Sequence, residues 1–273
     1  MTRYLKMIGN IVLYLAIYIA ISIIVNLTLG LAFRNTNVIS WILSNMSIVT
    51  IITNIPTILV YMLISKIMKQ DFSKKYNFNT FNYNYTYLLA LIGISLGVFS
   101  ISFLKINAIH EAFPLLAAIL DSIVSGKNLI IIVLGTITMG TILEEVLFRG
   151  LVFDELKVNM NIVLAVILQG LIFGALTLNI PVMLYAGMGG MIYGVVYIIF
   201  NSMWASIIAH FLSSATLLVL SKWGVNLITG ANAVYVSLGS FIVLAVSLYL
   251  LIRSKHKIQS EKFINASNEQ VNI

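Results

Sequence analysis

IGNIVLYLAIYIAISIIVNLTLGLAF, residues 8–33, contains no charged side chain. A helix that crosses the hydrocarbon core of a bilayer needs about 20 mostly apolar residues, so this run is long enough to span a membrane. It is too long for the apolar region of a signal peptide, so an uncleaved span is expected. Similar runs recur along the chain. The predicted spans are Ile8–Phe33, Val38–Ile67, Thr86–Leu104, Leu129–Val152, Met160–Leu178, Pro181–Phe200, Ser202–Leu220 and Val234–Ile252.

The composition supports the same fold class. Hydrophobic residues make up 60% of the 273 residues and charged residues 9%, whereas soluble domains carry roughly 25% charged residues. Lipid must therefore be the solvent for most of the surface. We expect an all-α, polytopic membrane helix bundle of about eight transmembrane helices. The chain has no cysteine, which excludes disulfides, Cys-based zinc sites and thiol catalysis.

The basic residues predict the orientation of the bundle. An even number of spans places both termini on one side of the membrane. With the termini inside, twelve of the sixteen Lys and Arg residues lie inside, and only Arg34, Lys105, Lys127 and Lys222 lie outside. Positive residues favour the cytoplasmic side, so a multi-pass protein of the cell membrane with both termini cytoplasmic is expected. The net charge of +7 is attributed to this topology and to anionic lipid, not to nucleic acid.

No repeat or linker divides the chain into independent domains. Three parts are predicted: N-terminal transmembrane helices with an outer interfacial segment (1–128), a core (129–220), and the last transmembrane helix with a polar cytoplasmic tail (221–273). Within the first part, Ile106–Ser125 contains Pro114 and is expected to be an interfacial or broken helix. The tail after Ser254 is expected to be disordered.

Two acidic residues stand out because they fall inside a predicted span. Of the nine acids, only Glu144 and Glu145 do so, and a charge at the centre of a membrane helix costs about 2.5–3.5 kcal/mol. Arg149 follows Glu145 by four residues, one helical turn, and can pair with it. Glu144 is rotated by about 100° and can face a cavity. The competing interpretation is a helix end whose charges reach the interface.

His210 is the one histidine within a predicted span. Ser206 and Ser214 lie four residues before and after it, so one helix face carries Ser-His-Ser. A single histidine in a span is more often a hydrogen-bonded packing residue than a catalyst. The buried acidic pair in the same chain favours a functional interpretation.

Together these motifs resemble a known family. Glu144-Glu145 with Arg149, then Phe173 in the next apolar helix, a glycine-rich helix, and His210 in the following one are similar to the CAAX protease and bacteriocin-processing (CPBP, or Abi) family of intramembrane proteases. The resemblance covers roughly 129–220. It implies a buried site in a helical bundle and hydrolysis of a peptide bond by an activated water.

The resemblance also implies a role for each site residue. Glu144 would be the general base that activates water. Glu145 and Arg149 would order Glu144. In the family a histidine follows the Phe motif and assists the base.

The remaining two motifs depart from the family pattern. The histidine position holds Thr177, which can hydrogen-bond water but cannot take its proton at neutral pH. His210, with Ser214 where the family has asparagine, would polarise the substrate carbonyl. Losing one acid–base group costs about 10²–10⁴ in rate, so Glu144 alone can still support slow hydrolysis.

The expected function is therefore an intramembrane CAAX-type endopeptidase that cuts a membrane-associated protein or peptide. The alternative is a catalytically impaired member that acts as a membrane scaffold or as a bacteriocin-immunity-type binding protein. A transporter with a proton or ion path ranks last, because no paired broken helices are visible. The expected partners are a membrane-anchored or peptide substrate, the bilayer and a membrane-protein partner. No cofactor or metal is expected, because a catalytic zinc needs three protein ligands.

Overall fold

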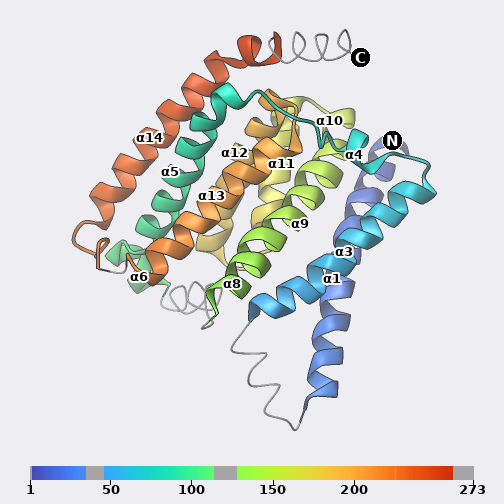
Figure 1. The fold of residues 1–273 in the computed structure, drawn as a ribbon, viewed down its shortest axis with the longest axis horizontal. Coiled ribbons are helices and arrows are strands. Elements are labelled where there is room, and N and C mark those ends of the chain that lie inside the picture. The colour runs from blue at the N-terminus through green and yellow to red at the C-terminus, as the bar shows by residue number, and fades with distance from the viewer. Residues whose placement is uncertain (1, 35–45, 114–127, 225, 261–273) are drawn as a thin grey trace. The chain divides into compact units, whose positions relative to one another are not determined.

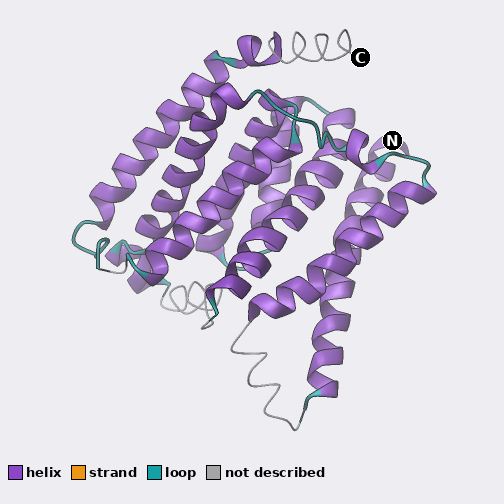
Figure 2. Ribbon diagram, viewed as in Figure 1, coloured by secondary structure: helices purple, strands orange, loops and turns teal. Residues whose placement is uncertain are grey.

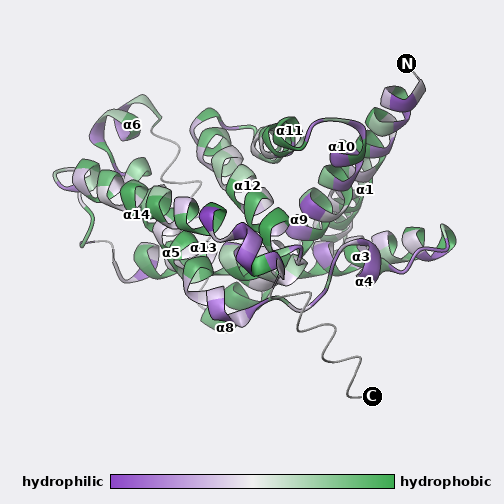
Figure 3. Cartoon of the chain, turned by 90° about the horizontal axis from the view of Figure 1, so that it is seen from above, coloured by the Kyte–Doolittle hydropathy of each residue, from purple (hydrophilic) through white to green (hydrophobic). Residues whose placement is uncertain are grey.

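The computed structural model describes residues 2–34, 46–113, 128–224 and 226–260, and these are helical without any strand (Figures 1 and 2). Seven helices are long and apolar enough to cross a membrane, and a shorter apolar helix, Ile162–Ala175, accompanies them. Figure 3 shows hydrophobic residues along most of the helices. The prediction of an all-α polytopic bundle of about eight helices is confirmed, and the chain is a multi-pass membrane protein.

Contacts within the chain divide it into two compact units. The first unit comprises 1–76 and 114–169, and the second comprises 77–113 and 170–273. The elements of the first unit are α1 (Thr2–Ala32), α3 (Met46–Ile67), α4 (Phe72–Lys75), α8 (Leu129–Ile132), η2 (Val133–Gly140), α9 (Thr141–Glu145), η3 (Val146–Val152) and α10 (Phe153–Asn159). The last five are consecutive parts of one helix (Figure 1). The boundary between the units falls within α11 (Ile162–Ala175).

Polar contacts join α1 to its neighbours in the first unit. The Tyr61 hydroxyl of α3 donates to the Tyr14 carbonyl oxygen at 2.8 Å. The Glu155 carboxylate of α10 accepts from the Asn10 amide at 2.9 Å and from the Tyr14 hydroxyl at 3.4 Å. These bonds explain why the helix continues through α10, beyond the predicted end at Val152.

A glycine allows α3 and η2 to approach closely. A Cβ added at Gly135 would lie 2.2 Å from the carbonyl oxygen of Ser47. The Ser47 hydroxyl hydrogen-bonds the Thr136 hydroxyl at 2.8 Å. The two helices therefore meet backbone to backbone, as small residues permit in membrane bundles.

The second unit surrounds an apolar core. Its elements are η1 (Tyr83–Tyr85), α5 (Thr86–Leu104), α6 (Asn107–Ala112), α12 (Ile180–Phe200), α13 (Met203–Lys222) and α14 (Ala233–Arg253). Fully buried members of the core include Leu88, Ile92 and Val196. Glycines again set the packing distance, because a Cβ at Gly93 or Gly97 of α5 would lie 2.5 or 2.6 Å from backbone oxygens of α13.

Two local predictions need comment. Residues 255–260 are helical, and Ile258 is 1% exposed, so the prediction of disorder from Ser254 onward is wrong for them. Ile258 belongs to the apolar core of the second unit, and this burial orders the segment. Residues 261–273 lie outside the described residues. Of the predicted interfacial segment, α6 is a helix, and Pro114 onward lies outside the described residues.

Candidate active site

The acidic pair lies in the middle of an irregular helix. Glu144 and Glu145 end the α-helical stretch α9, which separates two π-helical stretches, η2 and η3. In a π-helix each N–H bonds the carbonyl five residues earlier, and the Thr138 hydroxyl bridges the same interval by donating to the Val133 carbonyl oxygen at 2.8 Å. π turns are rare and concentrate at functional sites. The π-helical backbone on either side of Glu144 and Glu145 therefore favours a functional role for this part of the helix.

Glu145 and Arg149 form a buried ion pair. The Arg149 Nη1 lies 3.0 Å from the Glu145 Oε1, and both side chains are fully buried. The pairing predicted from their four-residue spacing is confirmed. An arginine cannot lose its proton in a protein, so the pair keeps two complementary charges inside an apolar helix bundle. The helix therefore carries a buried ion pair directly next to Glu144.

Glu144 is only partly buried and lies toward α1. Its carboxylate interacts electrostatically with Tyr18 of α1. Glu144 and Glu145 thus have different surroundings although they are adjacent. Glu145 is neutralised by Arg149, and Glu144 lies toward Tyr18 of the N-terminal helix.

His210 lies in the second unit, on α13, and is 8% exposed. Its ring stacks on that of Tyr193 from α12, with centroids 4.4 Å apart and planes at 18°. The Phe173 ring of α11 meets it edge-on at 6.2 Å. One turn earlier, the Ser206 hydroxyl donates to the Tyr193 carbonyl oxygen at 3.2 Å. The aromatic rings fix the plane of the imidazole.

Thr177 and Ser214 complete the predicted set in the second unit. Thr177 is exposed, in the turn after α11, and its hydroxyl donates to the Gly174 carbonyl oxygen at 2.8 Å. It therefore caps the end of the helix. Ser214 lies one turn after His210 on α13 and is partly buried. The structure joins Glu145 to Arg149 and places His210 and Ser214 on one helix.

Comparison with known families assigns this part of the chain. Residues 126–216 match the family model described as type II CAAX prenyl endopeptidase Rce1-like. These residues, called the Rce1-like segment below, are therefore similar to that family. The predicted resemblance is confirmed, and at the level of the family it indicates a CAAX-type intramembrane protease. No curated protein and no solved structure matches the chain.

The Rce1-like segment contains a buried polar residue that the motifs did not indicate. Gln169 of α11, one turn before Phe173, is fully buried, and among the described residues neither its amide nitrogen nor its amide oxygen has a hydrogen-bond partner. Its signal in the sequence is a lone carboxamide within the apolar run IVLAVILQGLIFGA. Tyr193 was also missed, because its contact with His210 depends on how α12 packs.

The charged residues of the Rce1-like segment are not arranged as a metal site. Within the described ranges, no group of three or more His, Cys, Asp or Glu side chains could hold a metal ion. Arg149 occupies one face of Glu145, which makes that carboxylate a poor ligand.

Proposed function

We propose that the chain is an intramembrane endopeptidase that hydrolyses a peptide bond in a membrane-associated protein or peptide with a water activated by Glu144. The observation that carries this proposal is the buried Glu145–Arg149 pair beside a second, partly buried carboxylate. An acidic residue inside a membrane helix is expensive and is by default a functional group. The Rce1-like match over the same residues supports it.

The proposed mechanism gives each residue one task. The Glu144 carboxylate takes a proton from water while the water oxygen attacks the scissile carbonyl carbon. The proton then passes to the departing amine. Glu145, neutralised by Arg149, keeps a second negative charge from competing for that proton. His210 and Ser214 are assigned to the carbonyl oxygen on the family resemblance.

Thr177 favours the alternative, a catalytically impaired member that binds a peptide or a partner protein as a scaffold or immunity-type protein. Its hydroxyl is used to cap α11, so it contributes a helix cap where the family has an acid–base histidine. The two functions differ in whether Glu144 is needed.

A cleavage assay separates the two. The purified protein in detergent is incubated with fluorogenic peptides that end in a CAAX sequence, with and without a prenyl group. Glu144→Ala is expected to lower the cleavage rate by about 10²–10⁴, and Thr177→His is expected to raise it. Asp154→Asn is the matched control, because it removes a carboxylate of the same helix that pairs only with Lys157 at 2.9 Å in the described structure. If no peptide is cut, and if cells that carry Glu144→Ala behave like cells that carry the unchanged protein, the peptidase proposal is contradicted.

The proposed location is the cell membrane, with both termini in the cytoplasm. One contact supports placing the N-terminus and the end of α10 on the same side: Arg3 donates to the Asn159 side chain at 2.6 Å and to the Val158 carbonyl oxygen. Labelling of cysteines introduced at the two ends of α1, in intact and permeabilised cells, tests this.

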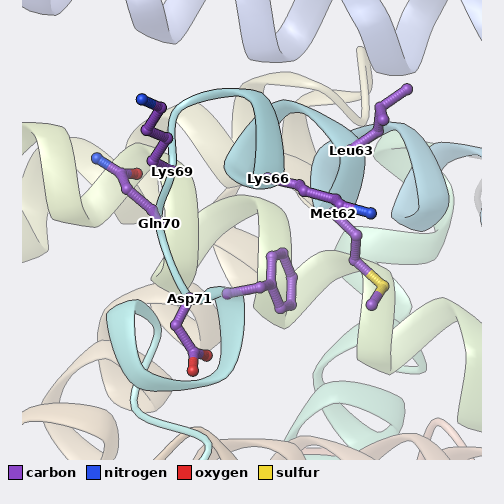
Figure 4. A pocket seen from close by; sticks show the side chains of 7 residues that line it. Met62, Leu63, Lys66, Lys69, Gln70 and Asp71 are labelled. Atoms are coloured by element: carbon purple, nitrogen blue, oxygen red, sulfur yellow. The ribbon is translucent and has the colours of Figure 1, made fainter.

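The end of α3 carries features of a membrane-surface contact on that proposed inner side. A pocket of about 520 Å³ lies there. Figure 4 shows Lys66 and Lys69 on different sides of it, with Asp71 below. Basic residues next to a span attract anionic lipid headgroups, so we assign this pocket to the bilayer surface.

A further inference from the structure

The first unit contains a polar pocket within its membrane-spanning helices. It has a volume of about 310 Å³ and lies among α1, α3 and η2. None of its described lining residues is charged. Polar side chains from all three elements face it: Tyr18, Ser22 and Asn26 of α1, Thr53 and Asn54 of α3, and Thr136 of η2. Hydroxyl and carboxamide groups are costly beside lipid, and they gather where a pathway or a polar ligand needs them.

Asn54 is the most informative of these side chains. It is 4% exposed and lines the pocket. It lies about 12 Å along α3 from Met46, which is deep in the apolar layer for a helix rising about 1.5 Å per residue. A carboxamide at this depth needs hydrogen-bond partners. A molecule that both donates and accepts hydrogen bonds would satisfy it.

The backbone of α3 adds a polar group without its usual partner at this level. Pro56 lies inside the helix, and a proline has no N–H to bond the carbonyl four residues earlier. The carbonyl of Ile52 therefore lacks its α-helical donor. In membrane helices such freed groups are satisfied by side chains or ordered water. Ile52 is on the same turn as Asn54, at the level of the pocket.

Tyr18 connects the pocket to the proposed base. Tyr18 lines the pocket together with Ser22. It also interacts electrostatically with Glu144, so the pocket and the carboxylate share a neighbour within the first unit.

We propose that this pocket holds water inside the membrane and passes it along Tyr18 to Glu144, an inference that rests on the proposed endopeptidase function. At about 30 Å³ for each water, the volume accommodates roughly ten molecules, and the lining supplies the two to four polar partners that an ordered water needs. Each turnover consumes one water. Its oxygen joins the acyl carbon, one hydrogen stays with the new carboxylic acid, and the other goes to the released amine.

The presence of water is tested without reference to activity. Because the chain has no cysteine, single cysteines report their own environment. In proteoliposomes, Asn54→Cys is expected to react with a small charged methanethiosulfonate at least about tenfold faster than Ile55→Cys, since only a hydrated thiol ionises to the reactive thiolate. Ile55 is the matched control at the same depth, with 43% of its surface exposed outside the bundle. Equal rates at the two positions overturn the proposal.

Ser22→Cys, which is nearly isosteric, guards against misfolding of the Asn54 variant. It is expected to react as fast as Asn54→Cys, and Ile24→Cys, 61% exposed on α1, is expected to react slowly. Adding Asn54→Leu to Ser22→Cys is expected to slow labelling by about tenfold because it removes the polar partner of the water. Unchanged labelling contradicts the role of Asn54.

Activity separates this inference from the proposed function. Glu144→Ala is expected to lower the cleavage rate by about 10²–10⁴ and to leave labelling of Ser22→Cys intact. Asn54→Leu is expected to lower the cleavage rate severalfold with little change in KM. Labelling without any Glu144-dependent cleavage refutes the endopeptidase and, with it, the supply of water to Glu144. Glu144-dependent cleavage with a dry pocket refutes only the water pocket.

Discussion

Replacing Arg149 by methionine is expected to destabilise the first unit strongly. The Arg149 Nη1 lies 3.0 Å from the Glu145 Oε1, with both side chains fully buried. At this distance two unit charges attract by about 5.5 kcal/mol for an effective dielectric constant of about 20. Part of this attraction offsets the desolvation of the two groups. Removing one partner of a buried pair costs about 3–5 kcal/mol, which is the expected loss in the free energy of unfolding.

The two single substitutions are not equivalent. Glu145 can take up a proton when Arg149 is gone, whereas the Arg149 guanidinium cannot lose one when Glu145→Gln removes its partner. Glu145→Gln is therefore expected to be the more destabilising change.

Reversible unfolding in mixed micelles, followed by far-ultraviolet circular dichroism, measures these losses. The Glu145→Gln/Arg149→Met double variant is expected to lose clearly less than the sum of the single losses. Lys157→Met is the control, because Lys157 pairs with Asp154 on the same helix but at a partly exposed position, where a pair contributes at most about 1 kcal/mol. Additive losses in the double variant, or a loss for Arg149→Met no larger than for Lys157→Met, would refute the reasoning.

Two further changes test the packing around the sites. Gly135→Val forces side-chain atoms against the Ser47 carbonyl oxygen, which a Cβ would already approach to 2.2 Å. We expect it to lower the free energy of unfolding by about 1–3 kcal/mol in thermal unfolding. Gly9→Val is the tolerated control, because a Cβ at Gly9 meets nothing within 4 Å. Tyr193→Leu removes the ring stacked at 4.4 Å on His210 and is expected to cost about 0.5–1.5 kcal/mol beyond the area lost, whereas Tyr193→Phe keeps most of that stability; equal losses for both would contradict the stacking argument.

The apolar runs predict most of the fold because membrane insertion depends on a local property, the hydropathy of about 20 consecutive residues. The position of a helix end depends more on contacts with distant parts of the chain. The helix continues past Val152 because Glu155 accepts hydrogen bonds from Asn10 and Tyr14 of α1, and hydropathy along one segment cannot reveal a partner 141 residues away in the chain. For the same reason, burial of Ile258 in the core was invisible in its polar surroundings.

In the candidate site, too, features within one helix could be predicted, and features that depend on contacts between helices could not. The Glu145–Arg149 pair follows from spacing on one helix, and the structure contains it. The stacking of Tyr193 on His210 joins two helices, and no spacing rule predicts it. The π-helical stretches on either side of Glu144 depend on which carbonyl each N–H selects, and composition does not determine that choice.

Those π-helical stretches have a consequence for how this protein is aligned with others. A hydrogen bond that spans five residues instead of four widens the turn so that it accommodates an extra residue, and η2 and η3 therefore contain residues that a regular α-helix of the same length in ångströms would omit. A homologue with regular turns would need single-residue gaps on both sides of Glu144. Such gaps, usually interpreted as loops, would here fall inside an unbroken helix. Deleting one residue from η2 is the matching engineering change, and it would convert a π turn into an α turn while leaving the later side chains of the helix facing their present neighbours.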